Sequence, residues 1–498
     1  MKKIFPYFIL MVAFTEGANL MAVELGAAKL LAPYFGTSLY AWAATLGVTL
    51  LALMCGYFAG GILSSKHYSE KKLPLVLFIA SCFICLTPVL ANFFLQKLYL
   101  LPVQLGSTLG LICYAFLPLF FLALSSPLMI QSYLPNTTSA GSAAGSVYAI
   151  STLGGIFATF FCGFYTLPTI GIANTLLVFS LSLFLLSFLF ISYQSKIWGI
   201  LFIILYSLCT FFADEFKDDK NALYHSEGIL GEIEVHDDSY FSFIKNKWID
   251  GRSLMVNGTG QSIADKSAQP LYTWHYVEVA KQVAQEYKNK KCLLLGMGAG
   301  IVAKEFATYG LTITAVELDA RIPEIAEKYF IGKNDFHTVV DDARHFINST
   351  NEMFDFIFID LFFSETPPAH VLTFQSFSKI KNLLHTNGSL LINLYGFSSG
   401  KNARPLYSIY NTLIQCGFSV QTIATKGKEA QRNLLLLASV NNKKVEIKTN
   451  TESYYLLPFE SNKKFPVLTD DINPLEVYFL KPASVWRSGW NKLLSEKK

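Results

Sequence analysis

The uneven distribution of charged side chains constrains this chain more than any other feature of its sequence. From Met1 to about Ala213 charged residues are rare, whereas from Asp214 onward they occur at an ordinary density. Over the whole chain they make up only 15% of the residues, and hydrophobic residues make up 52%. Soluble domains carry about 25% charged residues. The pattern predicts a multi-span α-helical membrane domain over residues 1–213, followed by a water-exposed part.

The first part contains seven apolar segments of roughly the length, about 20 residues, that a membrane-spanning helix needs. They cover residues 4–23, 40–63, 74–94, 109–129, 143–164, 175–191 and 198–213. The first and last are the weakest candidates, because one contains acids and the other is short. Residues 101–134 are long enough to contain a bent or re-entrant piece. The basic residues Lys2 and Lys3, and those of the loop at 66–72, predict that both regions face the cytoplasm.

Two acids, Glu16 and Glu24, interrupt the first apolar segment at a spacing that places them near one face of a helix. Ionisable groups at membrane depth are costly and usually face a protein interior or water. The pair predicts either a polar site for a cation or amine, or structural carboxylates that have partners or lie near the interface. The small-residue run at 56–61 favours close helix packing over ligand binding.

The second part begins with short alternating segments that predict β-hairpin strands, followed by a helix and a glycine-rich loop. The expected strands cover residues 229–235, 241–255, 291–295, 312–316, 338–340, 354–359, 389–394, 419–425 and 433–439, with helices near 271–287 and 301–308. The loop carries Gly296, Gly298 and Gly300, and the strand after the next helix ends at Glu317. This order is typical of a doubly wound nucleotide-binding fold, in which the acid accepts the ribose hydroxyls.

The glycine spacing also separates ligand classes. Dinucleotide folds favour G-x-G-x-x-G, but position 301 is Ile, and the G-x-G-x-G form fits S-adenosylmethionine or a close relative better. Asp342 follows a predicted strand and could accept from an adenine amino group, although it could also cap the helix that follows. Asp360 stands at the carboxyl end of another strand, where ligands bind in open α/β sheets.

Five short motifs between residues 228 and 395 occur together in one order. They are Gly258-Thr-Gly-Gln261, Trp274-His275, Gly296-Met-Gly-Ala-Gly300, Glu317-Leu-Asp319 and Asp342-Ala343. Together they resemble the spermidine synthase (polyamine aminopropyltransferase) family, in which a small β-domain precedes a Rossmann-like domain. Further motifs resemble a membrane-bound branch of that family, with a half-transporter-like bundle fused to a synthase-like domain. These are Glu24-Leu-Gly, Leu31-Ala-Pro-Tyr-Phe-Gly-Thr-Ser38, Asp360-Leu-Phe-Phe-Ser364, Pro368-Ala-His370-Val-Leu-Thr373 and Leu468-Thr-Asp-Asp471-x-x-Pro474.

The expected architecture has four parts. We predict a multi-span transmembrane domain at residues 1–213 and a small β-strand domain at 214–270. A Rossmann-like domain of the S-adenosylmethionine methyltransferase type follows at 271–445, and a C-terminal extension at 446–498.

The resemblance implies a transferase that moves an aminopropyl group from decarboxylated S-adenosylmethionine to an amine, with no permanently bound cofactor. The positions that match the family's donor-binding motifs are Gln261, His275, Gly296, Gly298, Gly300, Glu317, Asp342 and Ala343. Asp360 would hold and deprotonate the amine. The family's second loop acid is replaced by Phe363, so Glu365 is a candidate substitute, with a solvated loop residue as the alternative. Trp274 replaces a tyrosine that contacts the amine.

Two other functions stay open at this point. One is a methyltransferase that uses S-adenosylmethionine itself, because the amine half of the site departs from the family. The other is an amine transporter or sensor whose second half only binds ligand, which Glu16 and Glu24 suggest. Cys82 and Cys85 form a C-x-x-C in an apolar segment without a second pair, so no metal site is predicted.

We expect a multi-pass protein of the cell membrane whose soluble part faces the cytoplasm, where the sulfonium donor is made. An odd number of spans starting inside would place that part outside, so we expect one segment not to span or one to be hidden. The net charge of +4 is too small to indicate a nucleic-acid partner. The expected partners are a small amine and the membrane, and a homo-oligomer is possible.

Overall fold

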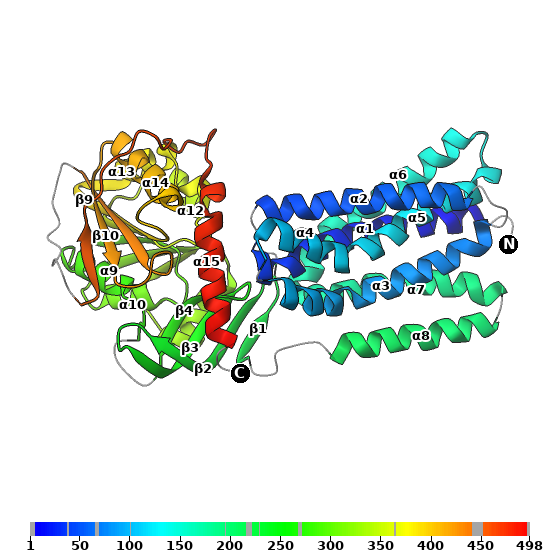
Figure 1. Ribbon diagram of the computed structural model, residues 1–498, viewed down its shortest axis with the longest axis horizontal. Coiled ribbons are helices and arrows are strands. Elements are labelled where there is room, and N and C mark those ends of the chain that lie inside the picture. The colour runs from blue at the N-terminus through cyan, green and yellow to red at the C-terminus, as the bar shows by residue number, and fades with distance from the viewer. Residues whose placement is uncertain are drawn as a thin grey trace. The chain divides into compact units, whose positions relative to one another are not determined.

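The computed structural model describes residues 5–36, 39–64, 69–99, 101–194, 196–215, 222–228, 230–266, 271–362, 365–440 and 452–495. Lys2, Lys3, Lys66 and Phe363 lie outside these residues. The chain divides into two compact units, which are described separately (Figure 1). The first comprises Met1–Lys220 and His225–Ile233, and the second comprises Asn221–Tyr224 and Glu234–Lys498.

The first unit is a bundle of apolar helices. In the described residues these are α1 (Phe5–Phe35), α2 (Leu39–Ser64), α3 (Ser69–Leu98), α4 (Val103–Tyr114), α5 (Phe116–Tyr133), α6 (Ala140–Phe161), α7 (Leu167–Gln194) and α8 (Lys196–Glu215), with short turns at Leu134–Asn136 and Cys162–Thr166. Five stretches of the described chain are long and apolar enough to cross a membrane, by length and composition only.

Those five stretches differ from the seven predicted segments for local backbone reasons. The predicted segments 143–164 and 175–191 fall in one 52-residue stretch, Ala140–Ile191, which contains a π-turn and a kink at Gly171, whose φ is 78°. The predicted segment 109–129 is divided at Ala115 between α4 and α5, so the stretch at 101–134 contains two helices and not one. The predicted segment 198–213 contains a shorter apolar helix, Gly199–Phe212. The number of spans stays a prediction.

Glycines set the approach of α2 to α5. A Cβ on Gly56 would lie 2.5 Å from the carbonyl oxygen of Phe120, and one on Gly60 would lie 2.5 Å from that of Leu124. Such contacts require glycine, because the backbones approach too closely for any side chain. The predicted packing role is therefore confirmed for Gly56 and Gly60, whereas Gly61 faces open space.

The second unit contains the larger of two sheets and most of the smaller one. The smaller sheet has the strand order β1-β2-β3-β4, with β1 (Tyr224–Ser226), β2 (Ile233–Ser242), β3 (Lys247–Val256) and β4 (Thr259–Asp265). Asn257 and Gly258 connect β3 to β4 with φ values of 50° and 68°, as a tight hairpin turn of the type that Asn-Gly favours requires. A small β-sheet is therefore present, as the sequence predicted, whereas the domain bounds of 214–270 stay a prediction. The predicted strand 241–255 is interrupted before β3 by a turn whose Asn246 has a φ of 48°.

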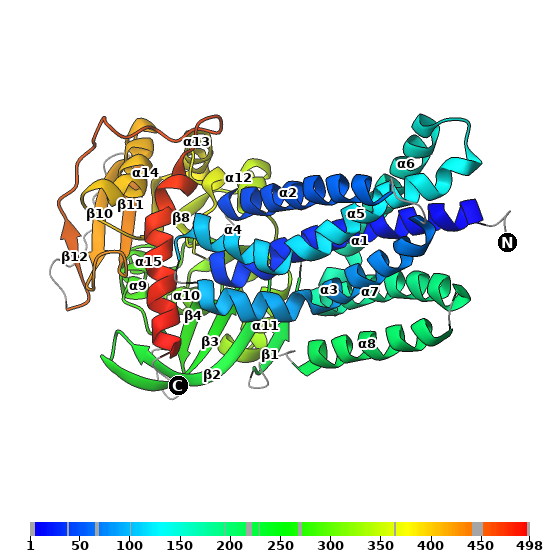
Figure 2. The same ribbon diagram turned by 45° about the vertical axis from the view of Figure 1, so that its right-hand side comes forward.

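The larger sheet has eight strands in the described residues, in the order β12-β10-β11-β9-β8-β5-β6-β7. They are β5 (Lys291–Leu295), β6 (Thr312–Glu317), β7 (His337–Val340), β8 (Phe354–Ile359), β9 (Leu384–Tyr395), β10 (Ser419–Thr425), β11 (Asn433–Ser439) and β12 (Tyr454–Leu457). Strands β5 to β9 pair in parallel, and β10, β11 and β12 join antiparallel at one edge (Figure 2). Strand β12 falls in the segment predicted as a C-terminal extension, which therefore contributes to the sheet.

Helices cover both faces of the larger sheet. They are α9 (Tyr276–Gln285), α10 (Ile301–Ala307), α11 (Arg321–Ala326), α12 (Ala343–Ser349), α13 (Phe374–Leu383), α14 (Arg404–Gln415) and α15 (Leu475–Ser495). In Figure 1, α12, α13 and α14 lie on one side of the sheet and α9 and α10 on the other. Strands β5, β8 and β9 are buried nearly throughout, as expected for parallel strands covered on both faces. The predicted Rossmann-like fold is confirmed.

The first testable prediction concerns the close contact of α2 and α5. Replacing Gly56 by alanine should lower the melting temperature of the purified protein in detergent, because overpacking costs about 1–3 kcal/mol. Gly61→Ala is the matched control, since its Cβ meets no neighbour within 4 Å and alanine favours helix. Equal melting temperatures for the two variants would contradict the packing role of Gly56.

Candidate active site

The glycine loop after β5 is built around the side chain of Glu317. The carboxylate of Glu317 accepts hydrogen bonds from the backbone N–H of Met297 at 3.1 Å, of Gly298 at 3.3 Å and of Asp319 at 3.1 Å. Burial raises the pKa of Glu317 above its usual value, and these three donors act in the opposite direction. Gly296, Gly298 and Gly300 all have positive φ. The loop therefore has a fixed shape, and the role of Glu317 toward a ribose stays a prediction.

Asp360 follows β8 directly beside that loop. A Cβ on Gly296 would lie 2.2 Å from the carbonyl oxygen of Asp360, so the two backbones are in contact. The Asp360 carboxylate accepts hydrogen bonds from the Tyr276 hydroxyl at 3.0 Å and from Asn393 Nδ2 at 2.8 Å. Burial raises the pKa of Asp360 to about 6, although these two hydrogen bonds act to lower it. The site thus contains an acid that titrates near neutrality and is held by neutral groups.

Sequence reasoning missed Tyr276 and Asn393. Tyr276 starts α9 directly after the Trp274-His275 motif, and Asn393 lies near the end of β9, which pairs with β8. Both positions were visible as neighbours of predicted features. Their contact with Asp360 depends on the strand order, however, which the sequence alone did not give.

Asp342 caps helix α12. Its Oδ1 accepts hydrogen bonds from the backbone N–H of Arg344 at 2.8 Å and of His345 at 3.1 Å, and its Oδ2 lies 3.1 Å from Nε2 of His370. Burial would raise the pKa of Asp342, but these bonds lower it overall. The capping role is therefore present, with Ala343 buried as the first residue of the helix. The predicted contact with an adenine stays a prediction.

A network around Arg344 accounts for two of the sequence motifs. The guanidinium of Arg344 donates to the carbonyl oxygen of His370 at 2.8 Å and to Thr373 Oγ1 at 2.9 Å. It also holds both carboxylate oxygens of Asp470, at 3.1 and 2.8 Å. Thr373 in turn donates to Asp470 at 2.7 Å. The motifs that contain His370 and Asp470 thus hold the loop after β8 against α12.

The small sheet supplies Gln261, and the start of α9 supplies His275. Gln261 lies on β4, next to Ser262, whose Oγ accepts from the backbone N–H of Ala299 in the glycine loop at 3.4 Å. His275 Nδ1 lies 3.9 Å from Glu278 Oε2, and no hydrogen-bond partner of this buried nitrogen is present among the described residues. The contacts of Gln261 and His275 with a donor stay predictions.

Glu365 is buried and paired. Its two carboxylate oxygens accept from Nε and Nη2 of Arg487, each at 2.6 Å, and its backbone carbonyl accepts from the Tyr395 hydroxyl. The side chains of Glu365 and Arg487 expose only 8% and 7% of their surface. The alternative that Glu365 is a solvated loop residue does not agree with this burial. As a base Glu365 would first have to leave Arg487, so Asp360 is the better placed acid.

The first unit contains one further group of potential ligands in the described residues. His225, Glu227 and Glu232 have ligand atoms within 4.8 Å of one another. His225 Nε2 lies 2.8 Å from Glu232 Oε1, and Glu227 accepts from the backbone N–H of Ile172 at the kink of α7. These contacts describe a hydrogen-bonded cluster that the sequence analysis did not identify.

The strand order and the glycine loop with its acid define a doubly wound domain of the Rossmann-like class. Comparison with known proteins narrows this class, because residues 272–394 match the family described as spermine/spermidine synthase domain. This match falls in the second unit and agrees with the resemblance that the motifs predicted.

Two curated relatives illustrate how far the similarity extends. Polyamine aminopropyltransferase 2 of Aquifex aeolicus is 26% identical over 436 residues, which cover 82% of this chain and 83% of that protein. A probable polyamine aminopropyl transferase of Bifidobacterium longum is 22% identical over 187 residues. That match covers 37% of this chain and only 40% of the relative.

Two solved structures also resemble part of this chain. A spermidine synthase from Thermotoga maritima is 16% identical with a TM-score of 0.36, and the match covers 46% of this chain and 81% of that one. A probable spermidine synthase from Corynebacterium glutamicum is 22% identical with a TM-score of 0.35, covering 44% and 78%.

The second prediction tests Glu317. Glu317→Ala should reduce the affinity of the full-length protein for methylthioadenosine at least tenfold, because hydrogen bonds to charged groups contribute about 1.5–3 kcal/mol each. Calorimetry measures the affinity. Glu352→Ala removes an exposed glutamate that pairs with Lys291 and serves as the control. Unchanged affinity in Glu317→Ala would exclude this residue from the nucleoside site.

Proposed function

We propose that the protein is a membrane-bound aminopropyltransferase that moves the aminopropyl group of decarboxylated S-adenosylmethionine to an amine. The observation that carries this proposal is the position of Asp360. Its carboxylate lies beside the glycine loop, is bonded by the neutral groups of Tyr276 and Asn393, and has a pKa raised to about 6. The family match over residues 272–394 supports the same reaction.

In this reaction the amine nitrogen attacks the aminopropyl carbon next to the sulfonium. A carbon–nitrogen bond forms, the carbon–sulfur bond breaks, and methylthioadenosine leaves with the electron pair of that bond. The amine loses a proton, which the carboxylate of Asp360 accepts. The sulfonium is already an activated leaving group, so the main contribution of the protein is to position the two reactants.

The donor would lie along the glycine loop. Glu317 would accept the ribose hydroxyls and Asp342 the adenine amino group. Gln261 and His275 would complete the site from the small sheet and α9. No resident cofactor takes part, and the donor is a co-substrate.

A methyltransferase that uses S-adenosylmethionine is the second candidate function. It is favoured by a 26% identity over 187 residues to an N-terminal histidine N-methyltransferase of Emericella nidulans, which covers 34% of this chain and 32% of that protein. Mass spectrometry of products formed with each sulfonium donor and a panel of amines separates the two. A transferred methyl group in place of an aminopropyl group would overturn our proposal.

The first unit motivates a further candidate, an amine transporter or sensor. Glu16 is buried in the helix bundle and accepts hydrogen bonds from Ser151 at 2.8 Å and Ser126 at 3.4 Å. Glu24, further along the same face of α1, is half-buried. A buried carboxylate bonded by hydroxyl groups suits a cation or an amine. Absence of turnover together with amine binding that Glu16→Gln abolishes would favour this candidate.

The third prediction tests the role of Asp360. Asp360→Asn keeps the shape and can keep the bond from Tyr276, but it cannot accept a proton. We expect kcat to fall about 10²–10⁴-fold, with little change in melting temperature or in affinity for methylthioadenosine. A large loss of thermal stability with activity retained would show that Asp360 is structural, and Glu365 would then be the acid to test.

The pH dependence provides a fourth prediction. Because the pKa of Asp360 is raised to about 6, its carboxylate is mostly protonated below that pH and mostly ionised above it. A base must be ionised, so kcat should rise as the pH increases through about 6. The rise should be absent from the residual activity of Asp360→Asn. The same rise in that variant would assign the titration to another group.

A fifth prediction concerns orientation, for which we propose that the soluble unit faces the cytoplasm. A cysteine introduced at the exposed position of Lys428 should react with an impermeant maleimide only after the cells are permeabilised. The parent chain without this cysteine is the control. Labelling of Lys428→Cys in intact cells would place the unit outside.

A further inference from the structure

Aromatic rings from distant parts of the chain meet next to Asp360. The ring centroid of Tyr395 lies 4.7 Å from that of Trp486, and Trp274 meets Trp486 edge-on at 6.1 Å. Trp274 also lies 6.1 Å from Tyr276, whose hydroxyl is bonded to Asp360. These four rings, called the aromatic cluster below, form a continuous apolar path from the acid to helix α15.

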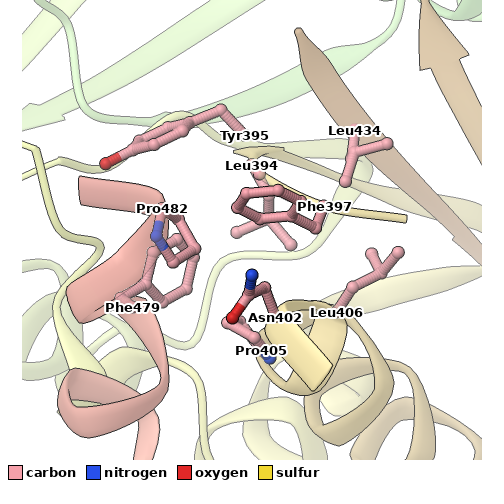
Figure 3. Close-up of a pocket in the computed structure, with 10 residues that line it drawn as sticks. Leu394, Tyr395, Phe397, Asn402, Pro405, Leu406, Leu434, Phe479 and Pro482 are labelled. Atoms are coloured by element: carbon pink, nitrogen blue, oxygen red, sulfur yellow. The ribbon is translucent and has the colours of Figure 1, made fainter. Parts of the chain in front are cut away.

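Helix α15 is packed firmly onto the sheet next to this cluster. Phe479 and Pro482 of α15 line a small pocket, facing Phe397 and Leu406 across it (Figure 3). Tyr395 belongs to both the pocket rim and the aromatic cluster. Trp486 is thus held in place by the helix that carries it.

The two acids near the aromatic cluster differ in whether a cation compensates their charge. Arg487, the neighbour of Trp486 on α15, holds both carboxylate oxygens of Glu365 at 2.6 Å, so this acid is neutralised within the protein. The intervening loop residues 361–364 are Leu-Phe-Phe-Ser and bring no other acid. Asp360, by contrast, is bonded by the uncharged Tyr276 and Asn393, so its charge is available to an ammonium group.

We propose that α15 forms the acceptor side of the active site and selects an amine with one ammonium group and an apolar body. This inference rests on the proposed aminopropyl transfer. The ammonium would pair with Asp360, and the body would lie along the aromatic cluster. A second ammonium at the far end would meet rings and a neutralised Glu365–Arg487 pair. The loss of its hydration would exceed what a contact with aromatic faces returns.

The test compares two amines of equal length with the purified full-length protein and decarboxylated S-adenosylmethionine. Butylamine has one amino group, and putrescine carries a second one at the other end. We expect kcat/KM for butylamine to exceed that for putrescine at least tenfold, measured by the release of methylthioadenosine. An equal or higher value for putrescine overturns the inference but leaves aminopropyl transfer intact. Absence of methylthioadenosine with every amine overturns both.

Two substitutions on α15 locate the selectivity. Trp486→Ala should raise KM for butylamine about tenfold, with kcat and affinity for methylthioadenosine nearly unchanged, and Trp486→Phe should restore most of the loss. Trp248→Ala, at an exposed tryptophan of β3, is the matched control and should behave like the parent. Equal KM values in Trp486→Ala and Trp248→Ala would overturn the role of α15.

The ion pair is tested separately. Arg487→Gln leaves the Glu365 charge unpaired and should shift the preference toward putrescine at least tenfold. This variant risks misfolding, since an uncompensated buried charge destabilises a protein. The double variant Glu365→Gln with Arg487→Gln removes both charges and should keep the preference for butylamine. A preference for putrescine in the double variant would overturn the role of the neutralised pair.

Discussion

The backbone contact between Gly296 and Asp360 sets the geometry on which the rest of the candidate site depends. The two residues end adjacent parallel strands, β5 and β8, and a Cβ on Gly296 would lie 2.2 Å from the Asp360 carbonyl oxygen. The φ of 91° at Gly296 adds a second reason for glycine. Because the donor loop and the acid share this contact, any side chain at position 296 would displace both. Their separation is therefore determined by the backbone and not by flexible side chains.

Two acids that follow β8, Asp360 and Glu365, have different electrostatic environments. Asp360 is bonded by neutral groups, so burial raises its pKa to about 6. Glu365 is bonded at both oxygens by Arg487 and remains an internal counter-charge. The amide of Asn393 cannot turn freely, because its Oδ1 accepts from Asn433 at 3.0 Å, which directs its Nδ2 to Asp360. The partners of Asp360 are neutral hydrogen-bond donors that do not compensate its negative charge. Such an acid is suited to exchange a proton with a substrate.

Local patterns were sufficient for much of the fold. The strands at 354–359, 419–425 and 433–439 have the predicted bounds, because continuous apolar runs between turn residues define buried strands. The capping of α12 by Asp342 was likewise anticipated. Contacts between distant segments were not accessible in this way. Arg487 lies more than a hundred residues after Glu365, and no spacing rule connects them. The predicted apolar segments and the helices differ in their bounds because a kink and a break do not interrupt an apolar composition.

This difference separates the two halves of the candidate site. Most of the proposed donor half lies between Gly296 and Ala343, a short stretch of alternating strands and helices, so its residues form recognisable motifs. The acceptor half combines Trp274, Asp360 and Trp486, which only the folded sheet brings together. Trp486 on α15 also lies outside the matched range of residues 272–394. A chain can therefore keep every family motif for the donor while residues of its last helix change which amine the site accepts. Similarity over the matched range includes Trp274 and Asp360 but not the residue that α15 contributes to the proposed acceptor side.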